Sequence, residues 1–145
     1  MIRDSQLVLD SANALTATAN GSNILDHSSL GNLGIGEPLA VVIEISVLGT
    51  GSGSFSAALV SADDVGISVN TQTLVTIPLG VAPKANTKAI GVLPPLDTNL
   101  TTNRYYQLQY TLSGSATVTV SQAFIQPLDQ IQNSSVFYPN GFKVL

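Results

Sequence analysis

The stretch that decides the fold runs from Arg104 to Gln126 and reads Arg-Tyr-Tyr-Gln-Leu-Gln-Tyr-Thr-Leu-Ser-Gly-Ser-Ala-Thr-Val-Thr-Val-Ser-Gln-Ala-Phe-Ile-Gln. Apolar and polar side chains alternate in both halves, and a period of two is typical of strands that bury one face. The segment between the halves, Ser113 to Ser115, is short and centred on glycine. The stretch is therefore predicted to form a β-hairpin at the centre of a β-sandwich.

The alternation also predicts which side chains of this stretch face the core. The predicted core-facing residues are Tyr106, Leu108, Tyr110, Leu112, Val118, Val120 and Phe124. Gln122 falls on the same face as these residues and Ile125 falls off it. This break in the pattern predicts a bulge or a change of face near Ser121.

Other short segments of strand-like composition precede this stretch, separated by Gly, Pro and Asn. We expect strands at residues 6–9, 14–19, 23–26, 39–48, 55–61, 72–79 and 87–93. Asn20-Gly21 predicts a tight hairpin turn, and the glycine-rich segment 49–54 predicts a flexible loop. Helix signals are poor throughout. The fold class is predicted to be all-β, a single jelly roll or β-sandwich of about eight antiparallel strands.

The chain has 145 residues, which suits one domain with a substantial core. We expect the sandwich over residues 1–126 and an extended C-terminal arm over residues 127–145. The arm is rich in aromatic and aliphatic residues, unlike a disordered tail, so it should pack either on its own sheet edge or on a neighbouring subunit. Its predicted interface residues are Ile131, Val136, Phe137, Tyr138, Phe142 and Val144.

Composition argues against several classes of partner. Charged residues make up 10% of the chain, against about 25% in an average protein. The net charge is −4 with five basic residues, which argues against nucleic-acid binding and against an anionic membrane surface. No apolar run approaches the ~20 residues of a membrane span, and the N-terminus does not read as a signal peptide. There is no cysteine, so disulfides and thiolate sites are excluded.

Candidate catalytic and metal-binding residues are few. His27 is the single histidine, and in a strand it would point away from its neighbour Asp26. Asp63 and Asp64 lack the ligand spacing of a calcium loop, so we expect a solvated turn with local hydrogen bonds. The serines have no nucleophile elbow, and the glycines form no phosphate loop. The sequence predicts no catalytic, metal or cofactor site, and the protein is not expected to be an enzyme.

One further arrangement suggests ligand binding. Tyr105 and Tyr106, with Gln107 and Gln109, offer the aromatic and amide groups that a sugar-binding face uses. Tyr at alternate strand positions is, however, typical of a core. A carbohydrate-binding β-sandwich is therefore kept as an alternative function.

Several segments, taken in order, carry a resemblance to a known family. They are Leu-Asp-Ser-Ala-Asn-Ala-Leu-Thr-Ala-Thr-Ala at 9–19, Asn-Ile-Leu-Asp at 23–26, Gly-Glu-Pro-Leu-Ala-Val-Val-Ile at 36–43, Arg-Tyr-Tyr-Gln-Leu-Gln-Tyr at 104–110 and Tyr-Pro-Asn-Gly-Phe at 138–142. In this order the chain resembles the cement (decoration) proteins of tailed bacteriophages, of the type on the short-tailed Bordetella phage capsid. The resemblance covers most of the chain and is weakest over residues 50–100.

The resemblance implies a jelly roll on the outside of an icosahedral shell. There the protein would bridge major capsid proteins of the HK97-like fold and stabilise the shell against the pressure of packed DNA. It also implies a symmetric dimer or trimer, made in the cytoplasm of a bacterial host and located on the exterior of the virion.

Overall fold

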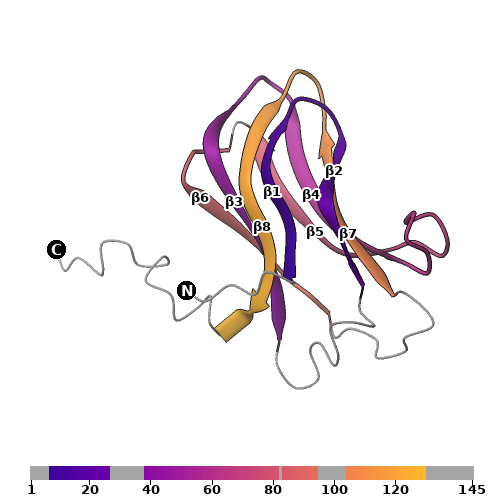
Figure 1. Ribbon diagram of the computed structural model, residues 1–145. Helices are drawn as coiled ribbons and strands as arrows, with labels where there is room; N and C mark the ends of the chain where they lie inside the picture. Colours follow the sequence, from indigo (N-terminus) through magenta and orange to yellow (C-terminus); the bar gives the residue numbers. More distant parts are fainter. Residues whose placement is uncertain (1–6, 27–37, 82, 95–103, 130–145) are drawn as a thin grey trace.

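The computed structural model describes residues 7–26, 38–81, 83–94 and 104–129 (Figure 1). This part of the chain forms eight β-strands. They are β1 (Val8–Leu15), β2 (Ala19–Asp26), β3 (Leu39–Thr50), β4 (Ser54–Ala62), β5 (Gln72–Val81), β6 (Thr87–Val92), β7 (Tyr105–Leu112) and β8 (Thr117–Pro127).

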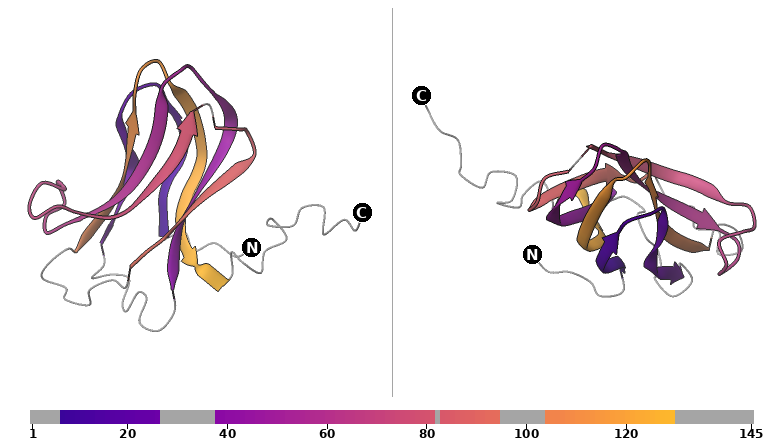
Figure 2. Two further views of the ribbon diagram at one scale, coloured as in Figure 1. Left: turned by 180° about the vertical axis from the view of Figure 1, so that it is seen from behind. Right: turned by 90° about the horizontal axis from the view of Figure 1, so that it is seen from above.

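The strands form two four-stranded antiparallel sheets packed face to face, with the orders β1-β8-β3-β6 and β2-β7-β4-β5. Consecutive strands lie in opposite sheets except β4 and β5, which pair directly (Figure 2). Eight strands wound between two sheets in this order form a jelly roll. The predicted fold class is confirmed.

The predicted hairpin over 104–126 is wrong, although both of its strands form. β7 pairs with β2 and β4, whereas β8 pairs with β1 and β3. The segment from Ser113 to Ser115 therefore crosses from one sheet to the other. Alternation predicts which face of each strand is buried but not its partner. Here the two apolar faces pack against each other across the sandwich instead of lying side by side in one sheet.

The hairpin predicted at Asn20-Gly21 is also wrong. These two residues lie inside β2, and the chain reverses earlier, at residues 16–18 between β1 and β2. The register of β2 against β7 is irregular between Asn20 and Ile24. Asn-Gly thus marks an irregular part of a strand here, and the short strands expected at 6–9 and 14–19 are largely replaced by the continuous β1.

The core between the sheets contains the predicted residues of β7. Tyr106, Leu108 and Tyr110 are all buried there, and the ring of Tyr110 stacks on that of Phe55 with centroids 5.8 Å apart. The four strands of each sheet contribute inward-facing aliphatic side chains to the same cluster. Burial of each large apolar side chain contributes about 1.5–3 kcal/mol, so this cluster is the main source of stability.

The predicted bulge near Ser121 is confirmed. Glu44 of β3 pairs with Gln122 and Ile45 pairs with Val120, which leaves Ser121 as the extra residue. Beyond the bulge the strand has changed face. Phe124, predicted to face the core with Val118 and Val120, lies instead on the outer side of its sheet in a separate buried cluster with Ala40 and Val42.

The glycine-rich segment between β3 and β4 packs closely against the β7–β8 connection. A Cβ on Gly53 would lie 1.4 Å from the carbonyl oxygen of Ser113, and Gly51 has a φ of +89°. The backbone N–H of Ser54 donates to Ser113 Oγ (2.9 Å), and the N–H of Ser113 donates to the carbonyl of Ser54 (3.0 Å). A loop does form at residues 51–53, and its glycines permit this close backbone approach.

The arm predicted over 127–145 is described only at its beginning. β8 ends at Pro127, and residues 128–129, the last described ones, are helical. The N–H of Leu128 donates to the carbonyl of Pro38 (2.8 Å), which ties the chain to the segment that precedes β3. The predicted interface residues of the arm lie outside the described residues.

Candidate functional site

A buried carboxylate lies between the two sheets. Asp10 of β1 is 0% exposed. Its Oδ1 accepts hydrogen bonds from the backbone N–H groups of Ser11 (2.9 Å) and Ser22 (3.0 Å). Its Oδ2 accepts hydrogen bonds from Asn13 Nδ2 (2.9 Å) and from the hydroxyl of Tyr110 (2.7 Å). This side chain therefore links β1 to β2 and β7, which belong to the opposite sheet.

The electrostatics of this cluster favour a charged Asp10 and a neutral Tyr110. Burial raises the pKa of the Asp10 carboxyl, but hydrogen bonds from Asn13, Tyr110 and Ser22 outweigh burial and lower that pKa overall. Burial strongly raises the pKa of the Tyr110 hydroxyl, and its hydrogen bond to Asp10 raises it further. The four donors satisfy the hydrogen-bonding capacity of the carboxylate, so Asp10 connects the two sheets. We call Asp10 with its partners Ser11, Asn13, Ser22 and Tyr110 the clasp.

Sequence reasoning missed this clasp. Asp10 follows the apolar run Leu7-Val8-Leu9, and an acidic residue at the end of such a run was the one available signal. Nothing in the pattern connects it to Tyr110, one hundred residues later in the chain. Only the packing of β1 over β7 brings the two side chains together.

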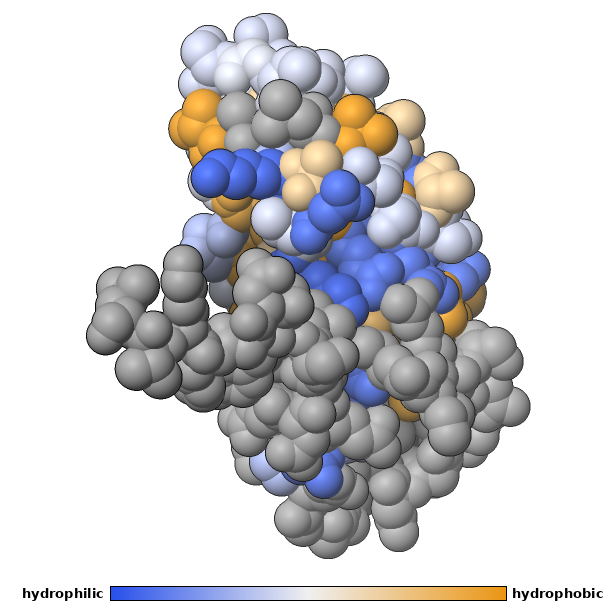
Figure 3. Space-filling view, turned by 90° about the vertical axis from the view of Figure 1, so that its left-hand side faces the viewer, coloured by the Kyte–Doolittle hydropathy of each residue, from blue (hydrophilic) through white to orange (hydrophobic). Residues whose placement is uncertain are grey.

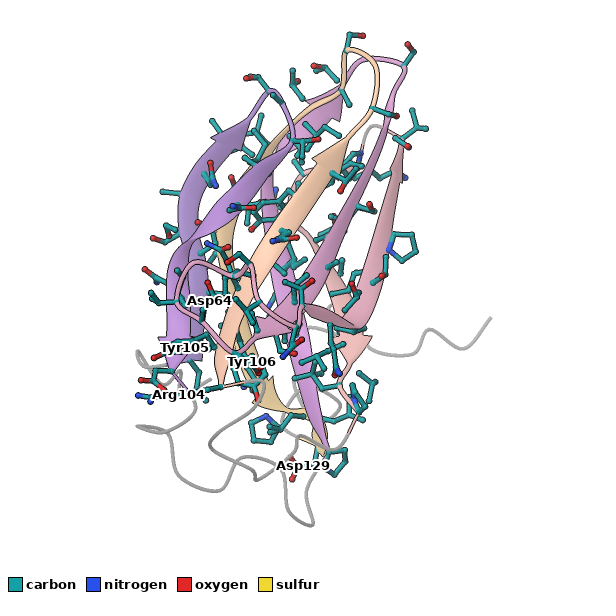
Figure 4. All side chains as sticks on the ribbon, turned by 90° about the vertical axis from the view of Figure 1, so that its right-hand side faces the viewer. Asp64, Arg104, Tyr105, Tyr106 and Asp129 are labelled. Atoms are coloured by element: carbon teal, nitrogen blue, oxygen red, sulfur yellow. The ribbon has the colours of Figure 1, made fainter. Side chains whose placement is uncertain are left out.

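Asp63 and Asp64 form the local hydrogen bonds expected of a turn. Asp64 Oδ1 accepts from the N–H groups of Ser68 and Val69 (both 2.8 Å), and Oδ2 accepts from Ser68 Oγ (2.7 Å). These hydrogen bonds lower the pKa of Asp64 to about 2. The hydroxyl of Ser68 contributes most, followed by the two N–H groups. Asp63 accepts from Asn70 Nδ2 (2.7 Å). These carboxylates stabilise their own loop, which Figure 4 shows in front of the β2-β7-β4-β5 sheet.

Arg104 precedes β7 and contacts the end of β2. Its Nε and Nη2 donate to the two carboxylate oxygens of Asp26, both at 2.7 Å. Its guanidinium carbon also lies 5.1 Å from the centroid of the Tyr105 ring. The bidentate geometry is specific, but both side chains are about one-third exposed, so the pair adds little stability.

The tyrosines of the carbohydrate-binding alternative lie on opposite sides of their sheet. Tyr106 is buried in the core, whereas Tyr105 packs against the outer cluster that contains Val60 and Ile67. The Arg104 guanidinium lies over the ring of Tyr105 (Figure 4). The two rings therefore form no shared stacking surface. Tyr105 lies on the outer face of the sheet, and Tyr106 lies in the core.

The outer face of the β1-β8-β3-β6 sheet carries a polar depression. Lys88 Nζ lies 3.1 Å from Glu44 Oε1, and both side chains are largely buried. The depression has a volume of about 240 Å³ and is lined by Glu44, Ile45, Ser46, Asn86, Thr87, Lys88 and Ser121. Figure 3 shows hydrophilic residues across the middle of this face. The paired charges neutralise each other, which suits contact with a polar surface better than binding of an ion.

The residues singled out from sequence do not gather into a catalytic site within the described ranges. Ser54 Oγ lies 3.0 Å from Ser113 Oγ, and Ser61 is 0% exposed. His27 and the six predicted interface residues of the arm lie outside these ranges, so the prediction for the arm stays a prediction.

The described residues also contain no metal-binding cluster and no membrane-spanning helix. No group of three or more His, Cys, Asp or Glu residues in these ranges could hold a metal ion. Among the same residues, no helix is both long enough and apolar enough to span a membrane.

A scan against protein-family models finds no match, and a search of curated proteins finds none either.

Proposed function

We propose that this protein is a structural component of a phage particle, a cement protein that binds the outside of an icosahedral shell and bridges its major capsid proteins. The observation that carries the proposal is the strand order β1-β8-β3-β6 and β2-β7-β4-β5. It is the jelly-roll order that the resemblance to phage cement proteins implies. Because a fold can host many functions, the proposal rests on this order together with the segments that carry the resemblance.

The surface of the molecule supports a contact role. With 10% charged residues, the chain builds its polar surface mainly from Ser, Thr, Asn and Gln. Neutral polar groups cost less to desolvate than charges when a partner covers them. The polar depression around Glu44 and Lys88 provides directional hydrogen-bonding groups on one outer face. Such a face fits a tightly packed protein neighbour, here the major capsid protein or a second copy of the chain.

The proposal places no chemistry in the protein. Asp10 and Asp64, whose pKa values are lowered, are each held by several hydrogen bonds from their surroundings. Both therefore serve the fold. The proposed activity is binding, and its measurable consequence is a mechanically and thermally more stable shell.

The test uses particles of the phage whose genome encodes this chain. Shells that lack the protein are mixed with the purified full-length chain, sedimented, and the bound chain is counted per shell by quantitative mass spectrometry. We expect saturable binding at a fixed ratio to the major capsid protein and a higher temperature of DNA release. A chain that stays in the supernatant at all concentrations would refute the proposal.

Two variants sharpen this test. Glu44→Ala and Lys88→Ala remove the two charges of the polar depression, and we expect weaker binding to shells if this face meets the capsid. Val65→Ala, in the exposed loop of the opposite sheet, is the matched control because Val65 is 63% exposed. Glycan binding that depends on Tyr105 or Gln107, without binding to shells, would favour the carbohydrate-binding alternative.

A further inference from the structure

The two long sides of the sandwich differ in how well the core is covered. On the side where β1 and β2 lie, Leu9, Leu15 and Leu25 are at most 6% exposed, while Leu7 and Ala19 are partly buried. On the side where β5 and β6 form the sheet edges, several core-packing side chains are only partly buried. They are Leu74, Val75, Leu79 and Ala89. Partly covered aliphatic residues along two neighbouring strand edges indicate a surface that another segment covers.

A groove lies along this open side. It has a volume of about 430 Å³ and is lined by the apolar residues Ile77, Pro78, Leu79, Pro83, Ala89 and Ile90 together with Thr87 and Lys88. This volume is in the range of pockets that enclose apolar ligand groups. The two prolines lack a backbone N–H, so they disfavour the addition of a further strand at this part of the edge. An occupant would fill the groove mainly with side chains.

The last described residues lead toward this groove. Leu128 packs in the outer cluster with Val42, Phe124 and Ile90. Ile90 packs on the same cluster as Leu128 and also lines the groove, so the chain leaves the sandwich near one wall of the groove. In the sheet order β8-β3-β6, the edge strand is two places from β8, or roughly 10 Å at the usual strand spacing.

We propose that the C-terminal arm of the same chain, residues 130–145, seats its aromatic side chains in the groove between β5 and β6. An extended chain spans at most ~3.3–3.6 Å per residue, so these residues can reach roughly 50 Å, far more than the distance needed. Because the arm belongs to the same chain and begins two strands from this edge, its effective concentration there is about millimolar, well above that of a second copy in dilute solution. In this position the arm packs on its own sheet edge and not on a neighbouring subunit. This placement goes beyond the proposed capsid function and does not depend on it.

A fluorescence experiment tests the proposal in the full-length protein. The chain has no tryptophan, so Phe137→Trp introduces a single reporter into the arm. We expect a blue-shifted emission that does not change when the protein is diluted. Adding Leu79→Lys, which places a charge in the groove, should shift the emission to the red. Adding Val65→Lys, at an exposed valine of the β4–β5 loop that does not line the groove, is the matched control and should leave the emission blue-shifted.

A disulfide experiment identifies which copy supplies the arm. The chain has no cysteine, so in the variant with Ala89→Cys and Phe137→Cys the only possible intramolecular disulfide joins these two positions. We expect an intramolecular disulfide that forms about tenfold or more faster than in the control pair Ser11→Cys and Phe137→Cys, since Ser11 lies on the opposite edge of the sheet. Mixing the two single variants should give little cross-linked dimer.

Three outcomes would overturn the proposal. Cross-linked dimers that dominate in the mixture would assign the arm to a second copy. Equal rates for the groove pair and the control pair, with emission unchanged by Leu79→Lys, would place the arm elsewhere. A red emission from Phe137→Trp alone, with no disulfide in the groove pair, would show an exposed arm. Capsid binding is measured separately, so failure of either proposal leaves the other standing.

Discussion

Replacing Asp10 with asparagine should destabilise the fold without changing its shape. Asn has the size of Asp, and its Oδ1 can keep the two bonds from the N–H groups of Ser11 and Ser22. Its Nδ2 would then face Asn13 Nδ2, and a donor would lie against a donor. The hydroxyl of Tyr110 can rotate to accept from the new amide, so this bond survives in a weaker, neutral form.

The expected loss follows from these contacts. A buried donor left without an acceptor costs about 1–3 kcal/mol. The three remaining hydrogen bonds become neutral, and each loses roughly half of its strength. Relief from burying a charge offsets part of this loss. We therefore expect a decrease of about 2–4 kcal/mol in the free energy of unfolding, a large share of the ~5–15 kcal/mol typical of a domain.

The loss should also depend on pH. The folded-state pKa of Asp10 is lowered from its usual 3.8, so its stabilising effect is present above pH 3.8 and disappears as the pH falls through the folded-state pKa. The difference between wild type and Asp10→Asn should therefore be largest near neutral pH and shrink in acid. Chemical denaturation followed by circular dichroism at several pH values measures it.

Tyr110→Phe supplies the matched control for this experiment. It removes only the hydroxyl that donates to Asp10, and we expect a loss of about 1.5–3 kcal/mol. The double variant should lose less than the sum of the two single variants, because both remove parts of one network. An Asp10→Asn variant within about 0.5 kcal/mol of wild type at neutral pH, or strict additivity with Tyr110→Phe, would refute the clasp.

Three other predictions concern the connections and the outer cluster. Gly53→Ala should lower the free energy of unfolding by about 2 kcal/mol or more, because its Cβ would lie 1.4 Å from a carbonyl oxygen. Gly80→Ala has open space around it but a φ of +73°, so it should cost only about 1–2 kcal/mol. Equal losses in chemical denaturation would contradict the close approach at Gly53. The carboxyl of Asp64 should titrate near pH 2 by NMR, so its loop contacts persist until the pH falls well below 3.8, and Ser68→Ala should raise that pKa; an ordinary value in the wild type would contradict these hydrogen bonds. Phe124→Ala should cost about 3–5 kcal/mol despite its place on an outer sheet face, and a loss below ~1 kcal/mol would show that this face is open.

Alternation of side chains proved a reliable guide to individual strands. It placed Tyr106, Leu108 and Tyr110 on the buried face of β7, and the break in the pattern located the bulge at Ser121. It failed for Phe124, because the bulge reverses the faces of the residues that follow it. Local rules therefore held as far as the next irregularity in the backbone.

Turn signals were a poorer guide. Asn20-Gly21 lies in a strand, and the segment at Ser113 joins two sheets rather than two paired strands. A short connection centred on glycine suits either arrangement, and the choice depends on which other strands compete for the free edges. Here β2 and β4 flank β7, and β1 and β3 flank β8, so the two strands have no free edge left to share.

By itself the sequence determined an all-β chain with few charges, about eight strands and no cysteine chemistry, because composition and periodicity act over short distances along the chain. Tertiary structure alone decided the strand order, the contact between Asp10 and Tyr110, and the groove between β5 and β6. Each of these joins residues far apart in the chain. Such contacts arise when two sheets pack and share one core, and a pattern within a single strand carries no record of its partner.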